Sequence, residues 1–69
     1  MVGKRRLSKT TLAIRAATRV PVMLQPGAIL EVRTTPNEGH RMMEVVWDGE
    51  PTLMFVQDVL ERSEPIDTD

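Results

Sequence analysis

Few side chains in this sequence could support catalysis, and those that could lie mostly in predicted turns. His40 follows a Pro-Asn-Glu-Gly run with Glu38 nearby, and a histidine beside a carboxylate can act as a general base or a metal ligand. A histidine in such a polar loop is more often solvated, so we interpret His40 as a loop residue. Glu44, Asp48 and Glu50 surround a predicted turn, and a polar turn explains them better than a metal site or an acid–base pair.

Hydroxyl groups, cysteines and glycines form no catalytic or cofactor pattern either. Ser8, Thr10 and Thr11 lack the histidine or lysine arrangement typical of an activated nucleophile. The sequence has no Cys, which excludes disulfides and thiolate metal sites, and its glycines are dispersed instead of forming a phosphate-binding loop. We therefore predict no catalytic residue, no metal and no cofactor, and the sequence leans against an enzyme.

A β-hairpin in the second half of the chain is the strongest structural pattern. An Asp-Gly pair at 48–49 is a strong turn signal between two β-rich runs. A two-residue turn pairs Trp47 with Glu50. A four-residue loop pairs Trp47 with Thr52 and better suits the missing N–H of Pro51. Both registers stay open at this point, and both give the same two faces.

This hairpin, residues 41–60, is apolar on both faces, because successive side chains of a strand alternate between faces. One apolar face builds a core, and a second apolar face requires a cover. The chain's own N-terminal segment could provide that cover, or another protein molecule could, either a partner or a second copy. We expect another molecule. The predicted core face carries Met43, Val45, Trp47, Met54 and Val56, and the predicted protein-contact face, interrupted by Glu44, carries Met42, Val46, Leu53 and Phe55.

The formal net charge of −1 hides a split along the chain. Residues 1–30 carry six bases and no acid, whereas residues 31–69 carry three bases and ten acids. We predict a basic arm, mobile or forming a short helix capped by Thr10 or Thr11 and ending near Arg19. The arm is expected to contact nucleic acid, an acidic partner surface or the acidic body itself. Its charged residues are Lys4, Arg5, Arg6, Lys9, Arg15 and Arg19.

Short strands separated by closely spaced turns predict an all-β body after the arm. Residues 20–24 alternate as a strand does, and they form either the first strand of the body or a segment lying across it. The expected elements are a strand over 20–24, a turn over 25–27, a strand over 28–35, a loop over 35–40, the hairpin, a helical turn over 57–60 and a closing strand over 60–62.

The predicted architecture is a small SH3-like barrel of four or five short antiparallel strands over residues 20–62. The basic arm or short helix occupies 1–19, and an acidic, frayed tail occupies 63–69. Sixty-nine residues allow a single domain with a modest core. Domains of this size often depend on disulfides, a metal or association, and the lack of Cys leaves association.

The sequence also bears on where in the cell the protein is located. No stretch is long and apolar enough to span a membrane, and Arg15 and Arg19 interrupt any apolar core of a secretory signal. The Arg, Ser and Thr content of the N-terminus resembles an organellar transit peptide, which stays open as an alternative. Because the absence of Cys fits a reducing compartment, we expect a cytoplasmic protein with no membrane partner.

A pattern of apolar residues, a turn glycine, Met-Phe, an Asp and a late Arg-x-x-Glu runs through residues 27–66. It consists of Val45, Val46, Trp47, Asp48, Gly49, Met54, Phe55, Asp58, Leu60, Arg62 and Glu64. This pattern resembles a group of short uncharacterised bacterial SH3-like barrel proteins. The resemblance brings no known activity, and it implies that the barrel is the common part.

The segments 52–55 (Thr-Leu-Met-Phe) and 60–62 (Leu-Glu-Arg) form a second pattern. It is similar to the last strands of the plasmid-borne type B dihydrofolate reductases, short SH3-like barrels that tetramerise around a central pore. The resemblance implies the fold and an oligomer. In that family a pore Gln and Tyr bind substrate and cofactor. Leu53 and Phe55 stand at those positions here, so the resemblance argues against the activity.

Together these observations predict a non-enzymatic interaction module that binds a protein partner or forms a homo-oligomer, with nucleic acid as a possible ligand of the arm. Trp47 and Phe55 are the sole aromatic residues, too few for a nucleic-acid stacking platform, a groove for Pro-rich peptides or a methyl-lysine cage. An oligomeric pore enzyme akin to the reductases and a small structural subunit of a larger complex are the alternatives.

Overall fold

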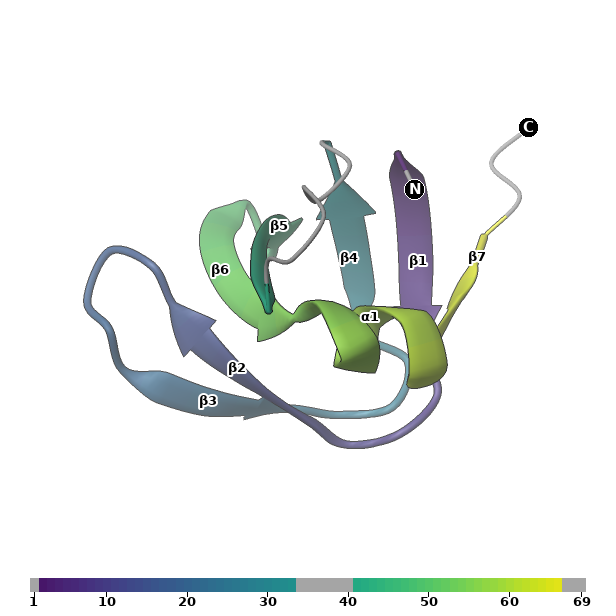
Figure 1. The fold of residues 1–69 in the computed structure, drawn as a ribbon, viewed down its shortest axis with the longest axis horizontal. Coiled ribbons are helices and arrows are strands. Elements are labelled where there is room, and N and C mark those ends of the chain that lie inside the picture. Colours follow the sequence, from purple (N-terminus) through teal and green to yellow (C-terminus); the bar gives the residue numbers. More distant parts are fainter. Residues whose placement is uncertain (1, 34–40, 67–69) are drawn as a thin grey trace.

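The computed structural model describes residues 2–33 and 41–66. These residues form seven strands and a short helix (Figure 1). The predicted loop at 35–40, with His40 and Glu38, lies outside the described residues. The elements are β1 (Gly3–Leu7), β2 (Thr11–Arg15), β3 (Pro21–Leu24), β4 (Ile29–Val32), β5 (Met42–Trp47), β6 (Glu50–Phe55), α1 (Val56–Glu61) and β7 (Ser63–Pro65).

The strands form a single antiparallel sheet in the order β3-β2-β6-β5-β4-β1-β7. The sheet bends, so that β2 and β3 lie below the other strands in this view, and α1 lies near the base of β4 and β1 (Figure 1). The all-β class is confirmed, with seven strands among the described residues instead of four or five. The sheet ends in two free edges, β3 and β7, so it is an open, bent sheet and not a closed barrel.

The first basic residues belong to the sheet, so the predicted mobile arm is wrong, as is a boundary of the β body at residue 20. β1 lies between β4 and β7 and pairs with both. Lys4 is opposite Glu31 on β4, and Arg6 is opposite Glu64 on β7. Opposite charges at facing positions stabilise neighbouring strands. The basic N-terminal segment is therefore placed next to some of the acidic residues from the second half of the chain.

The alternative of a helix between Thr10 and Arg19 is also wrong, because these residues form β2 and the turn that leads into β3. Ala13 is buried, whereas Leu12 is exposed and Ile14 half-buried on the other face. This period of two competes with the helical spacing of the alanines, and small side chains give an isolated helix little packing energy. Pairing with β6 favours the strand.

The central hairpin has the shorter of the two turns considered. Trp47 pairs with Glu50, and the two turn residues, Asp48 and Gly49, have φ values of 53° and 75°. Positive φ at both positions is the signature of a type I′ turn, which matches the twist of the strands. Pro51 follows the end of the β2–β6 ladder at Arg15 and Thr52, so its missing N–H interrupts no further strand pair there, and its carbonyl still accepts the Ala16 N–H at 3.2 Å.

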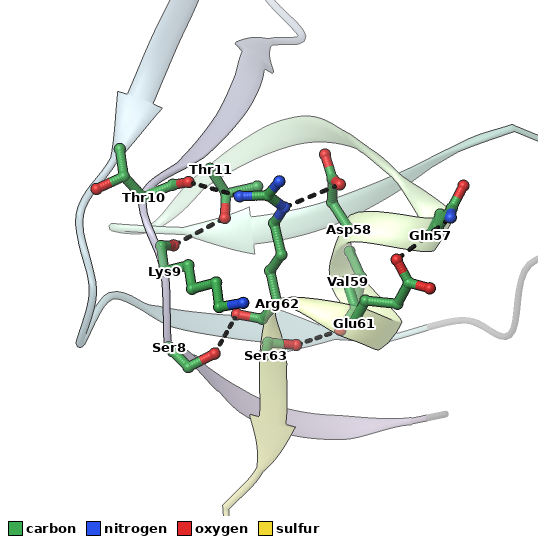
Figure 2. A network of polar contacts seen from close by, with 10 residues as sticks. All are labelled: Ser8, Lys9, Thr10, Thr11, Gln57, Asp58, Val59, Glu61, Arg62 and Ser63. Atoms are coloured by element: carbon green, nitrogen blue, oxygen red, sulfur yellow. Dashed lines mark hydrogen bonds and ion pairs between the residues drawn. The ribbon is translucent and has the colours of Figure 1, made fainter.

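The C-terminal strand also departs from the prediction. The expected helical turn is confirmed and extends over Val56–Glu61, but the closing strand is Ser63–Pro65 instead of 60–62. Ser63 is therefore a buried residue paired with Leu7, and the frayed tail does not begin there. Arg62 connects α1 to the β1–β2 loop: its Nε lies 3.5 Å from Asp58 Oδ1, and its Nη1 donates to the Thr10 carbonyl at 3.3 Å (Figure 2).

The hydrophobic core fills the inside of the bend. The predicted core face of the hairpin is confirmed: Met43, Val45 and Met54 are buried, and Trp47 and Val56 pack against them. Buried Thr and Ser hydroxyls also have partners, and no buried side-chain polar atom among the described residues lacks a hydrogen bond. The full set of buried apolar residues is Leu7, Ala13, Leu24, Leu30, Val32, Met43, Val45, Met54 and Val59.

Candidate interaction surface

The outward side chains of four adjacent strands, β3, β2, β6 and β5, are predominantly apolar. Strand register places them on one face, because residues two apart in a strand share a face. The four residues predicted from the hairpin lie together here, as the pairing of Met42 with Phe55 and the outward position of Leu53 and Val46 show. We call this surface the outer apolar face; it comprises Leu12, Ile14, Met23, Met42, Val46, Leu53 and Phe55.

The outer apolar face is organised in rows that cross the strands. In one row, Ile14 is paired with Pro21 on one side and with Leu53 on the other, and Leu53 is paired with Glu44. The neighbouring row contains two strand pairs, which are Met23 with Leu12 and Phe55 with Met42. Continuing the β2–β6 register by two residues joins these pairs into one row, with Leu12 opposite Phe55.

Exposure distinguishes this face from the core. Met23 is 55% exposed, and Leu12 and Phe55 are each 40% exposed, while Ile14 and Leu53 are half-buried. Exposed apolar side chains gathered on one surface mark sites of association. Scattered single exposures carry no such meaning, and here the residues are contiguous across four strands.

The described N-terminal residues do not cover this face. β1 lies in the sheet on the far side of β5 and β4, and residues 21–24 form the edge strand β3 beside β2. Of the two places predicted for segment 20–24, a strand within the sheet is the one observed. β3 enlarges the outer apolar face, because Met23 points outward.

Three residues of the outer apolar face, Leu12, Ile14 and Met23, were not predicted. A helix ending near Arg19, one of the alternatives, would separate Leu12 from Ile14, because residues two apart do not share a helix face. The open choice for 20–24 left Met23 unassigned. The signal that identifies them is the alternation in Thr-Leu-Ala-Ile at 11–14, where the inward residues are small and the outward residues are large.

A surface hollow of about 610 Å³ lies beside α1 and continues from Phe55. Phe55, Val56 and the 53%-exposed Leu60 give it apolar walls. Arg41, Gln57, Asp58 and Glu61 complete its lining, so charged and polar groups border the apolar residues. A surface that docked on the outer apolar face would therefore meet a recess at this end of β6.

The six basic residues predicted as an electrostatic arm are dispersed over the fold. Arg5 is half-buried: its Nε donates to Ser63 Oγ at 2.8 Å and its Nη2 donates to the Ser63 carbonyl at 2.9 Å. Lys4 and Arg6 are exposed on β1 opposite acids, and Lys9 lies exposed between β1 and β2. Arg5 thus joins β1 to β7, and binding of nucleic acid by the basic residues stays a prediction.

The remaining two arm residues lie at the distal end of the β2–β3 hairpin. The Arg15 guanidinium lies 5.2 Å from the ring centroid of Trp47 and also forms an ion pair with Glu50. A guanidinium over an indole face is a favourable cation–π contact. Arg19 is exposed in the turn with φ of 60°. Arg15 is thus part of the fold, while Arg19 remains at the surface.

The predicted carboxylate group does not assemble into one site. Glu44 lies on the outward side of β5, whereas Glu50 pairs with Trp47 on the inward side and contacts Arg15. Within residues 2–33 and 41–66, no three His, Cys, Asp or Glu side chains lie close enough together to hold a metal ion. Across the same ranges, no helix is both long and apolar enough to cross a membrane.

Comparison with known proteins adds no relative: no family model, curated protein or solved structure matches this chain. The two resemblances to bacterial barrel proteins and to the reductases stay predictions. Functional interpretation therefore rests on the geometry of the outer apolar face.

Proposed function

We propose that this protein is a non-enzymatic interaction module whose contact surface is the outer apolar face. The proposal includes a cytoplasmic location, in keeping with the absence of Cys. The observation that carries it is the contiguity of exposed and half-buried apolar side chains over four neighbouring strands, with Leu12 and Phe55 40% exposed and Met23 55% exposed. Such a surface is stabilised when another protein surface removes it from water.

The alternatives have weaker support. In the resemblance to the reductases, Leu53 and Phe55 stand where that family has its pore Gln and Tyr, and neither side chain has a polar group to hold a substrate. A nucleic-acid role draws on Lys4 and Arg6, which face Glu31 and Glu64 and are therefore partly neutralised. A structural subunit of a larger complex would use the same apolar contact surface and is a special case of the proposal.

Methionine oxidation tests whether the face is covered in the cell. Met23 is exposed on the outer apolar face, whereas Met54 is 0% exposed in the core. Peroxide converts an accessible methionine to its sulfoxide, and burial protects it. Cleavage after Arg19 and Arg33 releases a peptide, residues 20–33, in which Met23 is the sole methionine, so mass spectrometry reads this residue directly.

We expect Met23 to oxidise several-fold more slowly in intact producing cells than in dilute purified protein. Met54 is the internal control and should be slow in both samples. Equal Met23 rates in the cell and in dilute solution would contradict the proposal, because the face would then be open to water where the protein works.

A further inference from the structure

We infer that the outer apolar face is covered by a second copy of this chain, packed face to face about a two-fold axis that runs parallel to β2 and β6. This inference rests on the proposed function and names the occupant of the same surface. A two-fold interface uses the same patch on both copies, so the patch must be complementary to itself. The row structure of the outer apolar face meets this condition.

A two-fold axis lying in the interface between β2 and β6 exchanges the two sides of the patch. In the first row it places Ile14 opposite the partner's Leu53. In the second row it places Leu12 opposite the partner's Phe55 and Met23 opposite the partner's Met42. The six patch residues of these two rows therefore each meet another apolar side chain, while Val46, paired with Pro51, lies in a third row toward the partner's β2–β3 turn. This arrangement packs two sheets with roughly aligned strands, as sheets in β-sandwiches pack.

Charges at the margins of the patch also match under this axis. Glu44 ends the Ile14–Leu53 row on the β5 side. The same row ends on the β3 side at Pro21, two residues from the exposed Arg19. The axis thus brings Glu44 of one copy to the β3 side of the other, near the partner's Arg19. Within residues 2–33 and 41–66 neither Glu44 nor Arg19 forms an ion pair inside its own chain.

The size of the chain fits association of this kind. The structure exposes 4678 Å², and a typical stable interface covers about 800 Å² of each partner, roughly one-sixth of that total. A patch that extends over four of the seven strands can provide about one-sixth of the exposed surface. A net charge of −1 creates little repulsion between two copies, and without Cys the chain cannot be reinforced by disulfides.

The sheet edges are less suited to self-association than the face. β3 has four residues and begins with Pro21, and β7 has three residues and ends with Pro65. Short edges that contain proline offer few hydrogen-bonding groups to a neighbouring strand. Association therefore uses side chains of the outer face instead of backbone groups at an edge.

Sedimentation equilibrium of the purified chain over a micromolar concentration series tests the inference. The wild type is expected to be a dimer, and Phe55→Glu and Leu12→Glu are each expected to give monomers that keep the far-ultraviolet spectrum of the wild type. Ile29→Glu is the matched control, because Ile29 is 41% exposed but lies on β4 outside the patch. Two independent variants keep the test valid if one of them does not fold.

Charge reversal tests the axis itself. Glu44→Arg places a base near the partner's Arg19, and Arg19→Glu places an acid near the partner's Glu44, so each variant should weaken dimerisation about fivefold. The double variant Glu44→Arg/Arg19→Glu restores opposite charges and should recover most of the affinity at low salt. A double variant no tighter than either single variant overturns this axis.

The outcomes separate this inference from the proposed function. A wild-type monomer whose Met23 is nevertheless protected in cells overturns the second copy and leaves the interaction module standing. A monomer whose Met23 oxidises freely in cells overturns both. A dimer that survives both Phe55→Glu and Leu12→Glu shows that the contact lies elsewhere, and the inference is then wrong.

Discussion

Ser63 is a buried hydroxyl that joins three parts of the chain. Its Oγ donates to the Val59 carbonyl at the end of α1 and accepts a hydrogen bond from Arg5 Nε on β1. Ser63 itself begins β7 and pairs with Leu7. The residue thus satisfies a carbonyl that the end of the helix would otherwise leave free and fixes a cationic side chain against the sheet.

Replacing Ser63 with Ala should therefore lower the free energy of unfolding by about 1–2 kcal/mol, because it leaves Arg5 Nε and the Val59 carbonyl without this partner. Ser8→Ala is the control: Ser8 is exposed, and its backbone N–H already donates to the same Arg62 carbonyl that its Oγ contacts. Urea denaturation at a fixed protein concentration measures both, since dimerisation adds to apparent stability. Equal losses in the two variants would contradict this role for Ser63.

The β5–β6 hairpin sets the register of the whole outer apolar face. A one-residue slip in pairing would move every side chain of a strand to the opposite side of the sheet. The type I′ turn at Asp48 and Gly49 prevents this slip, because both residues have positive φ. The conformation suits glycine and, less well, aspartate, whereas most other residues adopt it at a cost.

Gly49→Ala should reduce stability by about 1 kcal/mol, since φ of 75° is strained for a residue with a Cβ. The added Cβ would meet no atom within 4 Å, so the loss reports backbone conformation and not a clash. Asp48→Asn, which favours the same conformation, serves as the control and should be neutral or stabilising. A neutral Gly49→Ala in thermal denaturation would mean that the turn relaxes to another type.

At the level of elements, the sequence was informative where local signals and burial agree. The Asp-Gly turn and the alternation of large apolar residues predicted both hairpin faces, and of the two registers left open the two-residue turn is the one observed. The region 10–19 was misread because Ala16 and Ala17 favour a helix locally. Its strand conformation depends on pairing with β6, whose residues lie some 40 positions further along the chain, as the Ile14–Leu53 pair illustrates.

Seen as a whole molecule, the protein places its basic N-terminal strand between two strands that carry acids. Lys4 and Arg6 are exposed on β1, at positions opposite Glu31 and Glu64. Glu31 also forms an ion pair with Arg33 at 3.1 Å. The half of the outer surface formed by β4, β1 and β7 is therefore rich in charges of both signs, in contrast to the outer apolar face.

The double variant Lys4→Glu/Arg6→Glu should destabilise the fold by about 0.5–2 kcal/mol, because it places like charges on facing strands. The loss should shrink at high salt, where exposed charges are screened. Lys9→Glu changes charge in a loop and should have a smaller effect. Urea denaturation at low and high salt provides the test, and a double variant as stable as the wild type at low salt would contradict charge pairing across β1.

For the candidate site, the alternation of apolar residues in the hairpin predicted an apolar contact surface but not its extent. Met42, Val46, Leu53 and Phe55 belong to one hairpin, so local alternation was sufficient to group them. Leu12, Ile14 and Met23 join them through pairings between distant segments. The sequence also did not predict that the six basic residues are dispersed over the fold, because a run of charged residues does not indicate which acids lie opposite it.

The pairing of β1 with β7 has a consequence for how this protein is made. Arg5 and Ser63 are separated by 58 positions, so the first strand cannot complete its pairing until almost the whole described chain has been synthesised. At about 5–20 residues per second, β1 waits roughly 3–12 s for its last neighbour to be translated. Leu12 is synthesised early in this interval and Phe55 near its end, so both precede the last strand of the sheet. Neither side chain can therefore take its place on a completed sheet before synthesis reaches β7.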